Sequence, residues 1–376
     1  MEELKASLGP LHTEDNILTA ANSSCEALEC FMVLIKEEKI AVGAICLLVG
    51  PFTLLGNALV LGLIATTATL RRRPSYVFIG SLALADIFVS SFFTTNFLAF
   101  HLFSHHYGAT VFLFMLGGVI MAFTGSVGSL LLTALDRYLC IHQAWRYKAL
   151  LTCRRAFLSL LILWGSIIFI SFLPLMGWSC PTGLSPPCSR LFPYISHGYL
   201  AFWICFILII LMLILGAYAL ILWKAHHHES SMTNLHARQD HIRMDIRLAR
   251  TFGLILLFLI GCWLPALSFM LADIFVYLTH TQQRIFAICS TLCLLNSAVN
   301  PLLYAMRCQE LRAALLQLIK NLHHKKYCHK CTTNSNPNLS SEENCNTFPD
   351  SDMPITTNKL NSVSQIVDKS QVNNKT

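Results

Sequence analysis

Charged residues are scarce in this sequence. Asp, Glu, Lys and Arg make up only 12% of its 376 residues, about half of their usual share in soluble proteins, and the mean hydropathy is +0.56. This composition excludes a disordered chain, a collagen, a coiled coil and an ordinary cytosolic enzyme. The apolar stretches also contain no nucleophile–base pair and no metal-ligand spacing, so the sequence does not indicate an enzyme.

The uncharged residues are gathered in long runs. A membrane-spanning helix needs about 20 predominantly apolar residues. Seven stretches reach that length, and Asp86 is the one charged residue that they contain. They are residues 40–70, 75–110, 108–135, 156–189, 191–223, 251–272 and 285–306. We therefore expect an all-α membrane protein, a bundle of seven transmembrane helices.

Two further absences limit the function. Residues 1–39 contain no apolar segment of the kind found in cleaved signal peptides, so the first span is expected to act as its own signal. No internal repeat is visible, which disfavours a transporter, because many transporters are built from repeated halves. A channel is disfavoured because its path would need more polar lining than Asp86 and scattered Asn and Ser residues supply.

Lys and Arg are unevenly divided between the two sides of the predicted bundle. Clusters follow spans one, three, five and seven, whereas the opposite loops hold only Arg190 and Arg284. Because cytoplasmic loops carry the excess of Lys and Arg, we expect an outer N-terminus and a cytoplasmic C-terminus in a multi-pass plasma-membrane protein. Asn22, in an Asn-Ser-Ser sequon, is then a glycosylation acceptor on the outer side.

These patterns divide the chain into three parts: an outer tail (1–39), a seven-span domain with a short amphipathic helix (40–325), and a disordered cytoplasmic tail (326–376). Within 309–326, leucines alternate with Arg312 and Lys320, which is typical of a helix lying on the inner membrane surface among lipid headgroups. The basic stretch around Cys328 and Cys331 favours anionic lipids and palmitoylation. Zinc binding by its His and Cys residues is a weaker alternative.

Four of the 15 cysteines fall in predicted outer segments: Cys25, Cys30, Cys180 and Cys188. Four cysteines allow three connectivities. Cys180 and Cys188 share one loop and could close a small ring in the oxidising exterior. We favour that bridge over free thiols.

Asp86 is the carboxylate predicted well inside a span. Ionisable groups at membrane depth are costly and are therefore candidates for function. Hydroxyl, amide and carboxylate oxygens together suit a small hard cation such as sodium, so a cation site is one interpretation and a structural hydrogen-bonding hub is the other. The candidate partners on other spans are Asn57, Ser126, Asn296, Ser297 and Asn300. We assign the cation site to Asp86, Ser126, Asn296 and Asn300.

Short motifs occur at fixed depths in the spans. Asp136-Arg137-Tyr138 ends span three, Cys262-Trp263-Leu264-Pro265 lies in span six, and Asn300-Pro301-Leu302-Leu303-Tyr304 ends span seven. Asn57 in span one, LALAD at residues 82–86 in span two and Trp164 in span four complete the set. Each motif is unspecific alone, but their order and depth together are specific. Over residues 40–325 the chain resembles the rhodopsin-like (class A) G-protein-coupled receptors.

The resemblance implies an activation switch. Arg137 would pair with Asp136 at rest and with Asp245 at the inner end of span six, and opening the second pair would admit a G protein. Pro265 removes a backbone donor and kinks span six. The switch residues implied are Asp136, Arg137, Tyr138, Tyr218, Asp245, Trp263, Pro265, Asn300, Pro301 and Tyr304.

Further absences exclude several subfamilies of these receptors. Span seven has no Lys, so no retinal Schiff base can form there. The outer half of span three has no carboxylate for a cationic amine. Residues 105–115 contain no Cys for the usual bridge to the second outer loop, and span five lacks its usual Pro.

Aromatic residues are abundant in the outer halves of the spans. Any one of them could equally face lipid or pack between helices, but together they indicate a pocket for a neutral lipid with few polar anchors. The predicted lining is Phe93, Phe97, Phe100, His101, Phe112, Val119, Phe123, Phe192, Trp203, Trp263, Met270, Phe286 and Ser290.

Longer strings narrow the resemblance. Residues 72–83 (RRPSYVFIGSLA), 124–139 (TGSVGSLLLTALDRYL), 173–178, 222–226 and 244–249 (MDIRLA) resemble the cannabinoid receptors. The short outer segment is similar to type 2 rather than type 1 members. The chain departs from the family pattern at Met115, where a Lys is usual, and at Gly118 and Ile120, where type 2 members have hydroxyl residues.

The resemblance implies a receptor for endocannabinoids, such as 2-arachidonoylglycerol and anandamide, that activates inhibitory Gi/o proteins and lowers cyclic AMP. Phosphorylation of the tail by receptor kinases would recruit arrestin. Membrane lipids are expected partners and nucleic acid is not, and no cofactor is expected beyond a sodium ion near Asp86. A class A receptor for a different lipid, a lysolipid or a sterol, is the alternative.

Overall fold

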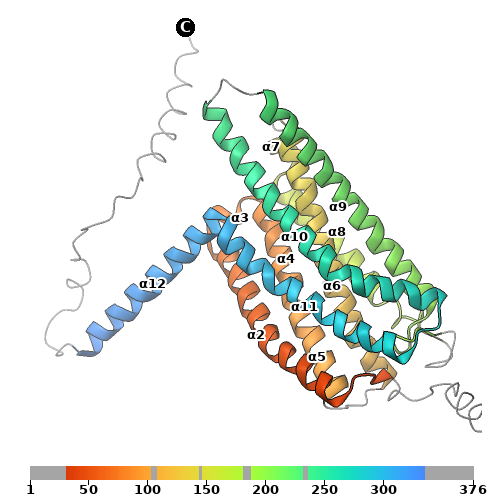
Figure 1. Ribbon diagram of the computed structural model, residues 1–376. Coiled ribbons are helices and arrows are strands. Elements are labelled where there is room, and N and C mark those ends of the chain that lie inside the picture. Colours follow the sequence, from red (N-terminus) through yellow and green to blue (C-terminus); the bar gives the residue numbers. More distant parts are fainter. Residues whose placement is uncertain (1–30, 103–107, 144–145, 181–187, 232–235, 335–376) are drawn as a thin grey trace, which may run out of the picture. The chain divides into compact units, whose positions relative to one another are not determined.

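The described residues are helical almost throughout. We describe the protein from a computed structural model, in which residues 31–102, 108–143, 146–180, 188–231 and 236–334 are described. Within these ranges, seven helices are long and apolar enough to cross a membrane (Figure 1), as expected from the sequence. The predicted glycosylation site Asn22, the cysteines Cys25 and Cys30, and the end of the tail lie outside the described residues.

The spans follow the chain in order. Span one is α2 (Lys36–Thr66), and span two combines α4 (Pro74–Phe88), η2 (Val89–Phe93), α5 (Thr94–Phe97) and η3 (Leu98–Leu102). The remaining five are α6 (Ala109–His142), α8 (Cys153–Ser171), α9 (His197–Ser231), α10 (His236–Phe275) and α11 (His280–Arg307). Short helices α3 (Ala68–Arg71) and α7 (Tyr147–Leu150) lie in connections, and α12 (Gln309–Asn334) follows span seven.

Helix α6 is central to the bundle. It packs against α4, α8, α9 and α10, while α2 packs against α4 and α11, and α10 packs against α9 and α11. Accordingly, 78% of the most apolar window of α6 is buried, compared with 17% for α8. Span three therefore contacts most of the other spans, and changes in span five or six reach it directly.

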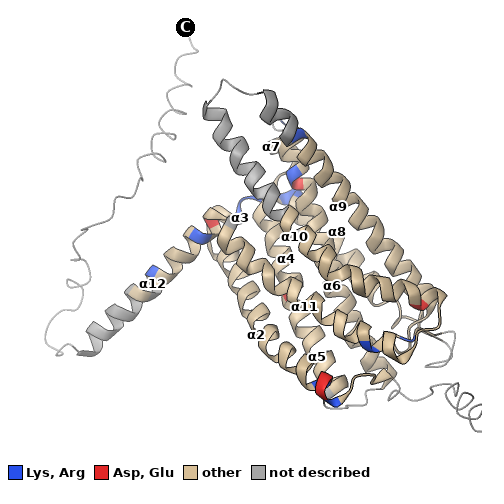
Figure 2. Ribbon diagram, viewed as in Figure 1, with Lys and Arg blue, Asp and Glu red and all other residues tan. Residues whose placement is uncertain are grey.

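The outward faces of the helices are apolar. Leu161, Met212 and Leu257 are 71%, 68% and 67% exposed, which would be unfavourable in water but suits a hydrocarbon environment. Figure 2 shows the bundle free of charge along most of its length, with Lys, Arg, Asp and Glu gathered near the helix ends. This distribution is that of a multi-pass membrane protein.

The helix bounds differ from the predicted ones in every span, and three of the differences change the description of the bundle. Span four ends at Ser171 rather than at residue 189, because Pro174 disfavours helical backbone at the residue before it and Gly177 takes a positive φ of 122°. Span two ends at Leu102, before residue 110. Span six extends to Phe275, beyond residue 272, and so includes Asp273.

Span two is irregular in its outer half, where two π-helical segments, η2 and η3, flank α5. Such segments often occur at functional sites. Near the first, the Ser90 hydroxyl donates to the carbonyl of Gly50 over 2.6 Å and joins span two to span one. The second carries His101, whose ring lies 4.6 Å from that of Phe97. The irregularity therefore changes which side chains of span two face the bundle interior.

Helix α12 begins as the sequence predicts but continues past residue 326 to Asn334. Near its start, Glu310 forms an ion pair with Arg73, and Leu311 is buried. The apolar side of this first part therefore packs on the bundle. The side chains of Cys328 and Cys331 lie outside the described residues.

Gly118 allows an unusually close approach between spans two and three. A Cβ atom at this position would lie 2.4 Å from a ring carbon of Phe92, whose ring also contacts Phe88 and Phe114. The Phe92 ring therefore occupies the space that a larger side chain at position 118 would need.

We predict that Gly118→Ala destabilises the protein by about 1–3 kcal/mol, the usual cost of overpacking. Thermal unfolding of the detergent-purified protein measures the change. Gly62→Ala is the control, because nothing lies within 4 Å of the added Cβ atom. Adding Phe92→Leu to Gly118→Ala should restore part of the loss. Equal melting temperatures for Gly118→Ala and the parent would disprove the close packing.

Candidate functional site

A cavity lies in the outer half of the bundle, among spans two, three, five, six and seven and the loop before span five. Its lining includes every ligand residue predicted from the sequence: Phe93, Phe97, Phe100, His101, Phe112, Val119, Phe123, Phe192, Trp203, Trp263, Met270, Phe286 and Ser290. The fold therefore brings these residues together, and their role in binding a ligand stays a prediction.

The cavity also includes residues that the sequence analysis missed. Phe31 and Val33 line it, although residues 1–39 were treated as a polar tail. The apolar run at residues 31–35 was the signal for them. Asn96 and Gln283 also line the cavity, and no sequence pattern distinguished them from other amides.

Aromatic rings form a continuous path along one wall of the cavity. The ring of Phe93 lies 6.2 Å from that of Phe123, and Phe123 meets Trp263 edge to face at 4.4 Å. Such pairs add to the energy of apolar burial. Phe123 on span three and Trp263 on span six are therefore in direct contact at the inner end of the cavity.

Spans three and five are joined across the same region. The indole N–H of Trp203 donates to the hydroxyl of Thr124 over 3.0 Å, and both groups are buried. This contact fixes the orientation of Trp203, whose ring lines the cavity.

Few polar atoms line the cavity, and several have no hydrogen-bond partner. They are Oδ1 of Asn96, Nδ1 of His101 and Oε1 of Gln283, all buried. The Ser290 hydroxyl donates to the carbonyl of Ala287 over 2.7 Å, so its oxygen can still accept a hydrogen bond. Buried unpaired polar atoms are uncommon in proteins, so these atoms are candidates for hydrogen bonds to a bound molecule.

A second polar region lies below the cavity. The amide of Asn300 donates to Oδ2 of Asp86 over 2.7 Å, and Asp86 is fully buried. Four oxygens there have no partner: Oδ1 of Asn57, Oδ1 of Asp86, Oγ of Ser126 and Oδ1 of Asn296. Asn57 ties span one to span seven through a 3.2 Å bond to the carbonyl of Ser297. The set of oxygens is of the kind that a hard cation prefers.

The weaker zinc alternative concerns His and Cys residues after span seven whose side chains lie mostly outside the described residues. Among the described residues, no three His, Cys, Asp or Glu side chains are grouped in a way that could hold a metal ion.

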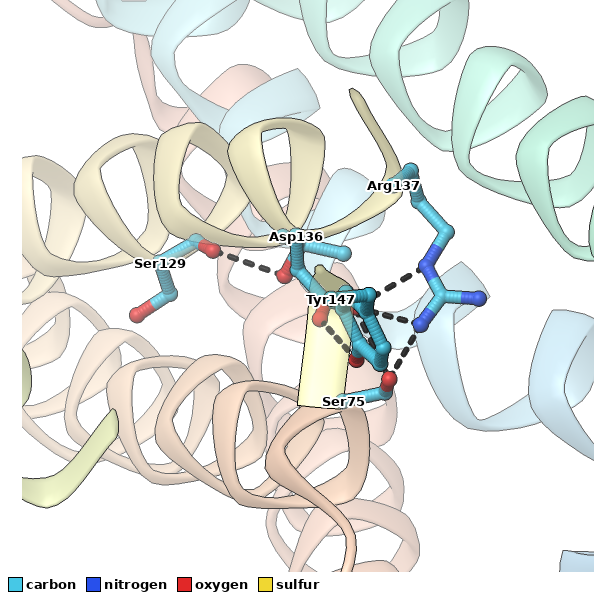
Figure 3. A network of polar contacts seen from close by, with 6 residues as sticks. Ser75, Ser129, Asp136, Arg137 and Tyr147 are labelled. Atoms are coloured by element: carbon cyan, nitrogen blue, oxygen red, sulfur yellow. Dashed lines mark hydrogen bonds and ion pairs between the residues drawn. The ribbon is translucent and has the colours of Figure 1, made fainter. Parts of the chain in front are cut away.

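The Asp136–Arg137 pair lies in a buried polar network at the other end of the bundle (Figure 3). Arg137 donates to the carboxylate of Asp136 through Nε over 2.9 Å and also contacts Ser75. Asp136 accepts from the hydroxyls of Ser75 (2.8 Å) and Tyr147 (2.7 Å). The network thus joins span three to span two and to α7. The predicted second partner of Arg137, the Asp245 side chain, lies outside the described residues.

Tyr147 was not predicted as part of this network. Its phenol is partly buried, and burial together with the nearby Asp136 carboxylate raises its pKa above the usual value. The hydroxyl therefore remains protonated and able to donate at physiological pH. A tyrosine in a connecting loop gives no sequence signal for such a contact.

Among the remaining switch residues, Tyr218, Trp263, Asn300, Pro301 and Tyr304 are buried, whereas Tyr138 and Pro265 are half-buried. The hydroxyls of Tyr218 and Tyr304 are buried and have no hydrogen-bond partner. Tyr138 stacks on His142 with ring centroids 4.3 Å apart. Pro265 and Pro301 lie within α10 and α11. These two unpaired hydroxyls could find partners in a different arrangement of the helices.

The outer end of the bundle is tied by polar contacts. Cys180 and Cys188 form a disulfide with a Cα–Cα distance of 5.6 Å, as predicted. Glu38 pairs with Arg284 over 2.9 Å. The Arg190 guanidinium donates to the carbonyl of Leu278 over 3.0 Å and lies on the ring of Tyr277.

Asp273 is a buried carboxylate near the outer end of span six, 3% exposed. It accepts a hydrogen bond from the Ser189 hydroxyl over 2.6 Å. The sequence analysis missed it because span six was predicted to end one residue earlier. The available signal for Asp273 was its position directly after the apolar run 251–272, at the same end of the bundle as the loop that carries Arg190.

Comparison with known proteins agrees with this arrangement. Residues 56–304 match the sequence profile of the 7 transmembrane receptor (rhodopsin family). The chain therefore belongs to the rhodopsin family of G-protein-coupled receptors and is a receptor, not an enzyme.

Within that family, the chain is similar to cannabinoid receptors. It is 43% identical to Cannabinoid receptor 1 of Taricha granulosa over 336 residues, which cover 85% of this chain and 69% of that receptor. It is 46% identical to Cannabinoid receptor 2 of Rattus norvegicus over 288 residues, covering 76% of this chain and 79% of that receptor. Both receptor types are about equally similar, so the comparison does not support the expectation of a closer relation to type 2.

We predict that Tyr147→Phe weakens the network around Arg137. It removes one hydrogen bond to Asp136 and should lower the free energy of unfolding by about 1 kcal/mol. Thermal unfolding measures the effect. In a double-mutant cycle with Ser75→Ala, the two effects should be non-additive, because both hydroxyls donate to the same carboxylate. Strictly additive effects would contradict a shared network.

Proposed function

We propose that this protein is a receptor for neutral lipid endocannabinoids, such as 2-arachidonoylglycerol and anandamide. The observation that carries the proposal is the cavity, which is lined mainly by aromatic and aliphatic side chains with a few unpaired polar atoms. An acyl chain would lie among Phe93, Phe97 and Phe123. The hydroxyl or carbonyl groups of the ligand would bind near His101 and Ser290.

An anionic lysolipid is less well supported. Its phosphate would require cationic groups at the cavity. Of the two arginines of the outer loops, Arg190 lines the cavity and Arg284 does not, and both already have partners. Arg190 is bound to Leu278 and Tyr277, and Arg284 pairs with Glu38. Asp273 would add a negative charge nearby. A sterol has an apolar body, so it remains the alternative that experiment must separate.

The proposed mechanism is a two-state switch. A ligand pressing on Phe123 and Trp263, which are in contact at the inner end of the cavity, would favour a different position of span six, for which Pro265 supplies a flexible point. Arg137 would then be released toward Tyr218 and Tyr304, and a Gi/o protein would bind in the opening. The ligand shifts this equilibrium only by its differential affinity for the two states.

The distribution of charge and the composition of the tail support a membrane location and cytoplasmic partners for the receptor. We place the receptor in the plasma membrane with its N-terminus outside, because Lys and Arg cluster beside the inner ends of the spans. Binding of Gi/o would lower cyclic AMP. Receptor kinases and arrestin would act on the cytoplasmic tail, which is rich in Ser and Thr.

We predict that membranes containing this protein catalyse guanine-nucleotide exchange on Gi in response to 2-arachidonoylglycerol. The Arg137→Ala variant should lose the response while keeping ligand binding, because Arg137 is far from the cavity. Exchange is measured with a labelled, non-hydrolysable GTP analogue at equal surface expression.

The result of this assay distinguishes an error in the proposed ligand class from an error in the proposed receptor mechanism. If a sterol but not 2-arachidonoylglycerol stimulates exchange, the receptor mechanism stands and the ligand class is wrong. If neither lipid acts on a receptor verified at the surface, the proposed ligand class is rejected. Met115, Gly118 and Ile120 would then be the first positions to examine.

We also propose that a sodium ion binds near Asp86. The unpaired oxygens of Asp86, Ser126 and Asn296 support this site, and the bound ion would favour the helix arrangement described here over the active one.

We predict that replacing sodium with a bulky organic cation raises agonist affinity about fivefold, a typical allosteric coupling. Asp86→Asn should abolish this difference, because it removes the charge that holds the ion. Agonist competition binding measures both effects. A sodium effect of unchanged size in Asp86→Asn would place the ion elsewhere.

A further inference from the structure

Four residues at the outer end of the bundle form what we call the outer clasp: Ser189, Arg190, Asp273 and Gln283. Asp273 lies on span six and Gln283 on span seven, while Ser189 and Arg190 belong to the loop that leads into span five. All of the contacts within the clasp are hydrogen bonds between described residues. The clasp therefore fixes one short loop segment to two different spans.

The Asp273 carboxylate is the centre of the clasp. It accepts from the Ser189 hydroxyl over 2.6 Å and from the backbone N–H of Arg190 at 3.1 and 3.2 Å. A buried carboxylate is costly unless it is hydrogen-bonded, and here both oxygens are used. The loop is therefore held against span six by its main chain as well as by a side chain.

The Ser189 hydroxyl transmits this constraint to the next residues. Its oxygen accepts from the backbone N–H of Leu191 over 3.2 Å and of Phe192 over 3.0 Å. Its hydrogen is donated to Asp273, so every capacity of the hydroxyl is engaged. Loss of the Asp273 acceptor would free the hydroxyl to rotate and loosen the turn that it stabilises.

Phe192 connects the turn to the cavity. Its side chain lines the cavity, and its ring meets Phe286 of span seven edge to face at 5.5 Å. On the other side, the side-chain amide of Gln283 donates to the carbonyl of Arg190 over 3.0 Å. The segment from Ser189 to Phe192 is thus held by Asp273 of span six and by Gln283 of span seven, and its Phe192 ring lines the cavity.

We propose that Asp273 is a positioning residue for the ligand pocket: acting through the Ser189 hydroxyl, it holds Phe192 over the cavity and so prolongs the residence of a bound lipid. The inference rests on the proposed function for the identity of the ligand, but the positioning of the loop does not depend on it. Affinity differences among related complexes arise mostly in the dissociation rate, so that rate is the quantity that the clasp should control.

The first experiment uses the full-length receptor without ligand. Hydrogen–deuterium exchange of the segment 188–196 is compared in the parent protein, Asp273→Leu and Ser189→Ala. The Leu191 and Phe192 amides should exchange about tenfold faster in both variants, because their shared acceptor is loosened or removed. Ser268→Ala, on the same helix but bonded to Leu264 of its own turn, should leave this exchange unchanged. Unchanged exchange in Asp273→Leu would overturn the proposal.

The second experiment measures dissociation of a labelled cannabinoid agonist from the same variants. Dissociation should be about tenfold faster in Asp273→Leu and in Ser189→Ala, and no faster in the double variant, because both act through one contact. Asp273→Asn keeps an oxygen acceptor and should recover most of the slow dissociation. If Asp273→Leu does not reach the membrane, Asp273→Asn and Ser189→Ala supply the same comparison.

The two experiments separate the possible failures. Multiplied rates in the double variant would show that Asp273 does not act through Ser189, and would overturn the proposal. Faster exchange with an unchanged dissociation rate would overturn the role in ligand residence. If the parent receptor binds no cannabinoid lipid, the proposed ligand is wrong, and the exchange data alone decide whether Asp273 positions the loop.

Discussion

The absence of water along the spans is the constraint on which this structure depends. Each polar group placed at membrane depth must find its partner within the protein or remain unpaired at a cost. Most do find one: Trp203 bonds to Thr124, Asn57 to Ser297, and Asp136 to Ser75 and Tyr147. Among the described residues, many of the polar atoms without partners lie in the outer cavity, around Asp86 and on Tyr218 and Tyr304, while others lie on Thr94, His142, Ser171 and His197. The first three of these are the places where we propose a ligand, an ion and a movement.

The three regions are linked through span three. This span contributes Phe123 to the cavity, Ser126 to the polar region below it and Arg137 to the network at the far end. Because α6 packs against α4, α8, α9 and α10, a structural change in any of the three regions alters contacts of this helix. The mechanism that we propose requires no long-range electrostatic effect. It requires only that the existing contacts along this one buried helix repack.

The fold and much of the site could be predicted from the sequence because both rest on long, regular patterns. Seven apolar runs define the spans, and the aromatic residues in the outer halves of the spans, Phe93, Phe97 and Phe100 among them, indicated the cavity lining. What could not be predicted depends on contacts between segments that no periodicity describes. The end of span four depended on Pro174 and Gly177, and the hydrogen bond of Tyr147 required the position of α7. The importance of Asp273 depended on where one helix ended.

The two π-helical segments of span two have a consequence for how the cavity could change over evolution. Each accommodates an extra residue without breaking the helix, so loss of one residue within Val89–Phe93 could restore regular α-helical geometry there. Such a deletion would leave Phe97, Phe100 and His101 facing nearly the same way, because the wider turn absorbs the extra residue without rotating the helix that follows it. Span two can therefore lose or gain a residue at this point while the cavity-facing side chains beyond it keep their directions.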